Sequence, residues 1–112
     1  MTTDFGLSIH DFKKVISEVS EYIVVDIRAE DNADSEGHFA EAFQIEEYEL
    51  PYDVNSVPLY FKNIVCVMVG DDPAIAAKWV NDYRGQDGKI TQLYYLDGTA
   101  PELFELCPEV KE

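Results

Sequence analysis

The chain has 112 residues, enough for one hydrophobic core and too few for two, so a single domain spanning residues 1–112 is expected. Its 46% hydrophobic content is typical of globular proteins rather than disordered ones. The 8 lysines and arginines are outnumbered by 23 aspartates and glutamates, and a surface with a net charge of −15 repels polyanions, which argues against nucleic acid or an anionic membrane as a partner.

The acidic excess leaves two explanations open. It can serve solubility or reflect an organism with an acidic proteome, or it can match a basic partner protein or a cation-rich medium. No apolar run approaches the ~18 residues that span a bilayer, and the N-terminus lacks the pattern of a signal peptide, so a cytoplasmic location is expected. Cys66 and Cys107 form neither a disulfide framework nor a metal-ligand pattern, so no metal and no cofactor is expected.

The first predicted element is a helix of about three turns that begins after Ser8. Ser8 and Asp11 resemble a capping box in which aspartate replaces glutamate. The apolar residues that follow Ser8 lie on one stripe at helical spacing, and they are Ile9, Phe12, Val15, Ile16 and Val19.

Three continuous apolar runs, at residues 22–27, 64–69 and 90–96, predict strands buried on both faces of a parallel sheet. Between the last two runs, Asp72 suits an N-cap, Pro73 the first helical position and Gly85 the C-terminal cap, which predicts a helix over residues 73–84. This order indicates an α/β fold with a central, mainly parallel sheet flanked by helices on both faces. Residues 46–63, with Pro51 and Pro58, favour neither helix nor strand.

Four motifs in chain order resemble the rhodanese homology family. Asp26-Ile27-Arg28 follows the first long strand, and residues 37–42, Gly-His-Phe-Ala-Glu-Ala, are similar to the family's Gly-His-Ile-Pro-Gly-Ala-like motif. An apolar strand that leads to a helix with an Ala-Ala pair (64–79) and the sequence Leu-Asp-Gly-Thr at 96–99 complete the series. The resemblance covers residues 8–104 and implies a rhodanese-like fold.

The matched residues also have structural interpretations that need no activity. Asp26 is expected to accept hydrogen bonds from a loop backbone, and Arg28 to pair with an acid. Gly37 is expected to permit a tight turn. His38 is interpreted as a hydrogen-bonded, partly buried histidine rather than a base, because the sequence indicates no nucleophilic residue that it would activate. Gly98 belongs to the last motif.

The resemblance also implies where catalysis would take place. Active members of the family carry a cysteine at the end of the central strand, followed by a six-residue loop whose N–H groups and arginine cradle a persulfide or an oxyanion. Aligned on Ala76-Ala77, Val67 takes the cysteine position and Asp72 lies near the arginine position. The degenerate active-site loop then has no thiol and no cation, and consists of Val67, Met68, Val69, Gly70, Asp71 and Asp72. No catalytic residue is therefore assigned.

Cys66 offers an alternative nucleophile. It lies one residue before the cysteine position, and side chains alternate along a strand, so its sulfur is expected on the other side of the sheet. Asp71 and Asp72 would also raise a thiol pKa and repel an anionic substrate. Asp72, as an N-cap, would place a carboxylate where the family binds substrate.

Three functions are compatible with the sequence. The first is a catalytically inactive rhodanese-like domain that acts as a protein-interaction or regulatory module, with its contact region at residues 48–61 unless the aromatic rings there pack onto the sheet. The second is a sulfurtransferase or phosphatase-like relative, with Cys66 as the persulfide-forming nucleophile. The third is an acidic protein that associates with calcium or magnesium at Asp71 and Asp72.

Overall fold

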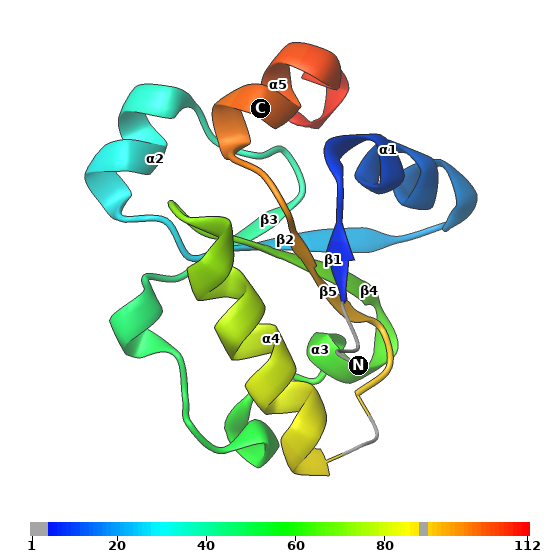
Figure 1. The fold of residues 1–112 in the computed structure, drawn as a ribbon, viewed down its shortest axis with the longest axis vertical. Coiled ribbons are helices and arrows are strands. Elements are labelled where there is room, and N and C mark those ends of the chain that lie inside the picture. Colours follow the sequence, from blue (N-terminus) through cyan, green and yellow to red (C-terminus); the bar gives the residue numbers. More distant parts are fainter. Residues whose placement is uncertain (1–4, 88–89) are drawn as a thin grey trace.

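The computed structural model describes residues 5–87 and 90–112. Five strands there form one sheet in the order β1-β5-β4-β2-β3, and all neighbouring strands run parallel (Figure 1). The predicted, mainly parallel central sheet is thus confirmed. The strands are β1 (Gly6–Leu7), β2 (Tyr22–Asp26), β3 (Ala42–Gln44), β4 (Val65–Val69) and β5 (Leu93–Leu96).

Helices cover both faces of the sheet, as predicted. Alternate residues of β4 belong to two separate cores: Val67 packs in one with residues of α1 (Ile9–Glu18) and α5 (Ala100–Leu106), and Met68 in the other with residues of α3 (Tyr60–Asn63) and α4 (Pro73–Asp87). Figure 1 shows α1 and α5 lying apart from α3 and α4 across the strands. A strand buried on both sides needs no polar alternation, which explains the continuous apolar run.

The predicted first helix is confirmed as α1. The Ser8 hydroxyl accepts a hydrogen bond from the backbone N–H of Asp11 at 3.0 Å, which caps the helix. Phe12 is fully buried, and Ile9, Val15, Ile16 and Val19 pack against the same core. The apolar stripe therefore faces the sheet as its spacing requires.

The third predicted strand is shorter than its apolar run. The runs at 22–27 and 64–69 each lose one residue, but the run at 90–96 is a strand only from Leu93. Ile90 is buried in the core beneath α4 without belonging to a strand. Its apolar side chain therefore reflects burial rather than strand pairing.

Gly85 does not end helix α4, so that prediction was wrong. The helix continues to Asp87, and Gly85 lies exposed inside it without a positive φ. The side chain of Gln86 explains the extension, because it accepts a hydrogen bond from Val54 N at 2.9 Å and donates one to Tyr52 O at 2.7 Å. These bonds tie the last turn to the neighbouring segment.

Residues 46–63 form short helical turns. They comprise η1 (Glu47–Glu49), η2 (Val54–Ser56) and α3, joined by irregular chain that runs along α4 (Figure 1). Another short helix, α2 (Glu30–Glu36), follows β2. The two prolines and the acids explain why no regular period was visible.

Candidate functional site at the carboxyl edge of the sheet

The carboxyl ends of the parallel strands meet at one edge, where open α/β sheets place their ligands. β2 ends there with Asp26, β3 with Gln44 and β4 with Val69, and Asp26 pairs in register with both of the others. Asp26, which opens the first family motif, therefore lies at the edge where a site is expected.

Asp26 and Arg28 form a buried ion pair. Arg28 Nε and Nη2 donate to the two carboxylate oxygens of Asp26 at 2.8 and 2.7 Å, and Arg28 Nη1 reaches Glu36 at 3.2 Å. Burial lowers the pKa of the Arg28 guanidinium, but its hydrogen bonds to the two acids outweigh that effect and leave the pKa raised. The expectation that Arg28 pairs with an acid is confirmed.

Asp26 and Gly37 also have the local roles expected of them. Asp26 Oδ1 accepts a hydrogen bond from the backbone N–H of Arg28 at 3.2 Å. Gly37 ends α2 with a φ of +109°, a conformation that L side chains rarely adopt, and its carbonyl accepts a bond from Arg28 Nη2 at 2.8 Å. The first two family motifs are thus joined through Arg28.

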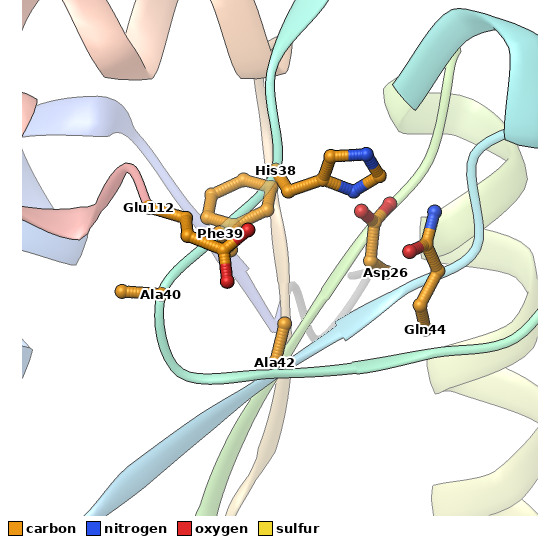
Figure 2. A pocket seen from close by; sticks show the side chains of 7 residues that line it. All are labelled: Asp26, His38, Phe39, Ala40, Ala42, Gln44 and Glu112. Carbon is orange, nitrogen blue, oxygen red and sulfur yellow. The ribbon is translucent and has the colours of Figure 1, made fainter. Parts of the chain in front are cut away.

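A small hollow lies over Asp26. Its volume is about 350 Å³, and Figure 2 shows the His38 ring, the Asp26 carboxylate and the Gln44 amide close to one another there. His38 Nε2 lies 2.9 Å from Asp34 Oδ1, so the histidine is hydrogen-bonded and partly buried as predicted. Glu112 lines the opposite part of the hollow, which sequence reasoning did not anticipate. Gly98 lies elsewhere, against Ile9 of α1.

The connection from β4 to α4 is shorter than the predicted loop. Val67, Met68 and Val69 belong to β4 and are fully buried, so only Gly70, Asp71 and Asp72 join the strand to the helix. The placement of Val67 at the start of a loop is thereby corrected. Alignment on the helix could not locate the end of the strand. Three residues are too few for the six-residue cradle that the resemblance implies.

Carboxylates of the protein itself occupy backbone N–H groups at this edge. Asp72 Oδ1 accepts a bond from Ala74 N at 2.9 Å, which confirms Asp72 as the cap of α4. Asp71 Oδ2 accepts a bond from Ala29 N at 3.0 Å, and Glu46 Oε1 accepts one from Glu30 N at 3.1 Å, both where α2 begins. Acids thus fill the N-terminal ends of two helices that would otherwise attract an anion.

The Cys66 sulfur lies in the core rather than at the carboxyl edge. It is fully buried on the α3 and α4 side, 3.3 Å from the carbonyl oxygens of Tyr60 and Ile64. Burial raises the pKa of this thiol to about 12. Cys107 is also buried and free, in the opposite core. A buried, protonated thiol is chemically inert.

The segment proposed as a contact region is divided between surface and core. Tyr48, Tyr52 and Leu59 are 81%, 82% and 69% exposed. Leu50, Val54, Val57 and Phe61 are buried in the core that includes β4. The alternative that the rings pack onto the sheet therefore holds for Phe61 but not for Tyr48 or Tyr52. It also holds for Tyr60, which packs against the same core and lies 5.6 Å from Phe43 of β3 between ring centroids.

Sequence reasoning missed Trp79 on α4. Its ring lies 5.7 Å from that of Tyr52 between centroids, and its indole N–H donates to Glu47 at 2.8 Å. No sequence signal marks this contact, since it depends on how the irregular segment lies against α4.

Among the described residues, no three His, Cys, Asp or Glu side chains are grouped as a metal ion requires. No helix within them has the length and apolar character needed to cross a membrane.

Solved structures of other proteins share this fold. The rhodanese-like domain protein of Staphylococcus aureus has a TM-score of 0.61 and 19% identity over 85% of this chain and 92% of its own. The rhodanese-like domain of an Anabaena protein has a TM-score of 0.58 and 17% identity over 86% and 88%. A Rhodopseudomonas palustris protein described as a possible tyrosine phosphatase has a TM-score of 0.68 and 16% identity over 92% and 81%.

These similarities establish that the chain has a rhodanese-like fold. No protein-family model and no curated protein matches its sequence. Because one fold supports different chemistries, the residues at the site and not the fold decide the function.

Proposed function

We propose that this rhodanese-like domain is non-catalytic and serves as a protein-interaction or regulatory module. The observation that carries the proposal is the connection Gly70-Asp71-Asp72, whose carboxylates accept hydrogen bonds from Ala29 N and Ala74 N. A thiolate that attacks an anionic substrate needs free N–H groups and positive charge around it. This connection presents two negative charges instead.

The position of Cys66 supports the same proposal. A persulfide forms from a thiolate, and a pKa of about 12 leaves almost none at neutral pH. The thiol also lies in a closely packed core, where an added sulfur atom would clash with its neighbours. Sulfur transfer through Cys66 would therefore require local unfolding.

Exposed apolar side chains supply the surface that an interaction needs. Tyr48, Tyr52 and Leu59 lie on one segment of the chain, and tyrosine is enriched in the cores of protein interfaces. The net charge of −15 favours a basic partner, because opposite charges accelerate association and suppress wrong partners. We therefore place the contact region at residues 48–61.

A sulfurtransferase assay tests the proposal. The protein is incubated with thiosulfate and cyanide, thiocyanate is measured, and hydrolysis of para-nitrophenyl phosphate is followed in parallel. We expect neither product above the protein-free rate. Thiocyanate production that disappears in Cys66→Ser and persists in Cys107→Ser, with both variants folded by circular dichroism, would instead identify a sulfurtransferase that uses Cys66.

A further inference from the structure

A shallow groove lies between the segment that contains η1 and helix α4. Its volume is about 710 Å³, and it is lined by Glu47, Tyr52, Lys78, Trp79, Asn81 and Asp82. The planes of the Tyr52 and Trp79 rings are inclined by only 30°, and Tyr52 is mostly exposed. The groove therefore presents two aromatic rings, inclined to each other, to a ligand.

Hydrogen bonds hold Trp79 and the backbone at Tyr52 in place. The Tyr83 hydroxyl donates to Pro51 O at 2.5 Å, and Gln86 Nε2 donates to Tyr52 O at 2.7 Å. Trp79 is fixed by its bond to Glu47. A binding surface that is already ordered loses little conformational entropy when a ligand binds.

The surroundings of the aromatic pair are mainly acidic. Glu47 and Asp82 lie in the groove, and the exposed Tyr48 of η1 lines a second hollow of about 370 Å³. That hollow is lined by the carboxylates of Glu30, Asp34, Glu46 and Glu49. Among the described residues that line the two hollows, Lys78 is the only base. The charge of this face therefore complements a cation.

We propose that the groove binds an arginine side chain from a basic segment of a partner protein, stacked on Tyr52 and Trp79 and paired with Glu47 and Asp82. Arginine suits this site better than lysine because its guanidinium is planar, weakly hydrated and able to donate to carboxylates while it stacks on a ring. The proposal deepens the proposed interaction function and rests on it. Further cations of the same segment lie over the acidic hollow around Tyr48.

Signals from Trp79 can be used to measure peptide binding to the groove. Trp79 is its only tryptophan, so tryptophan fluorescence and the indole N–H signal in nuclear magnetic resonance report on the groove alone. The probe is a capped glycine-rich pentapeptide with two arginines. Matched peptides carry lysine or citrulline, a neutral analogue with the same planar shape. We expect saturable shifts with the arginine peptide, weaker binding of the lysine peptide and none of the citrulline peptide.

Four variants assign the binding to this groove. Tyr52→Ser should weaken arginine-peptide binding about two- to fivefold, the range of an exposed cation–π contact. Glu47→Gln should also weaken it, while its amide oxygen can still accept the bond from Trp79. Lys78→Gln should strengthen binding, because it removes a like charge. Leu106→Ser removes an exposed apolar side chain on α5 and should change nothing.

Binding of the citrulline peptide as tight as that of the arginine peptide would overturn the proposal, as would unchanged affinity in Tyr52→Ser or weaker binding in Lys78→Gln. Absence of any shift at millimolar arginine peptide would also overturn it, and would leave the non-catalytic function standing. Thiocyanate production, by contrast, would refute the non-catalytic function whatever the peptide does. The two failures are thus distinguishable.

Discussion

Replacing Arg28 with methionine is expected to destabilise the domain strongly. Arg28 is 0% exposed and its partner Asp26 is 1% exposed, and two bonds of 2.8 and 2.7 Å join them. Methionine fills much of the space but leaves the Asp26 carboxylate buried without its counter-charge. Breaking a buried pair in this way costs about 3 to 5 kcal/mol, a large share of the roughly 5 to 15 kcal/mol that stabilises a typical domain.

Urea unfolding followed by far-ultraviolet circular dichroism measures this cost, provided that the slope against urea stays constant. The double variant Asp26→Asn with Arg28→Met should lose less stability than the sum of the two single variants, because asparagine is neutral and needs no counter-charge. A loss below about 1 kcal/mol in Arg28→Met would match a solvated surface pair instead. Asp26 and Arg28 would then be available to a ligand, against the structural role assigned to them.

Two further predictions concern α4 and the buried thiol. Gly85→Ala should raise the free energy of unfolding, measured in urea, by about 0.5 to 1 kcal/mol. The reason is that Gly85 lies inside α4 and a Cβ there meets nothing within 4 Å. A decrease would show that α4 is distorted at Gly85. Burial raises the pKa of Cys66 from 9.0 to about 12, so the native thiol stays protonated while the unfolded one ionises. The contribution of Cys66 to stability is therefore fully present below pH 9 and is lost as the pH rises towards 12. Cys66→Ala should flatten this alkaline decline in urea unfolding measured at several pH values, and an identical decline in both proteins would contradict it.

The parts of the fold that were predictable from sequence are those with a repeated physical signal. The stripe of α1 and the continuous apolar runs of β2 and β4 each reflect burial against the sheet. β1 has two residues and β3 three, with only Phe43 of β3 partly buried, so neither produces such a run. The strand start predicted at Ile90 and the helix end predicted at Gly85 were both wrong. An apolar side chain can be buried outside a strand, and a glycine can lie inside a helix.

At the candidate site, local pairs were predictable and distant ones were not. Asp26 and Arg28 are close in sequence, and Asp72 caps the helix that it precedes. Their hydrogen-bond partners could therefore be predicted from residue type and sequence position. The end of β4 depends on the register between strands, which an alignment on Ala76-Ala77 could not supply. The contact between Tyr52 and Trp79 depends on the packing of an irregular segment on α4.

The acids at the sheet edge and the aromatic groove have a common electrostatic consequence. Glu46 accepts a bond where α2 begins, and its sequence neighbour Glu47 accepts one from the groove's tryptophan, so these two carboxylates form a short acidic strip between the two places. An anionic substrate at the edge would have to displace carboxylates that are already hydrogen-bonded, whereas a cationic segment along the strip displaces none. Higher ionic strength should therefore weaken binding of the arginine peptide, because screening acts on exposed charges. It should not create anion binding at the edge, because Asp71 and Asp72 still occupy the N–H groups of Ala29 and Ala74.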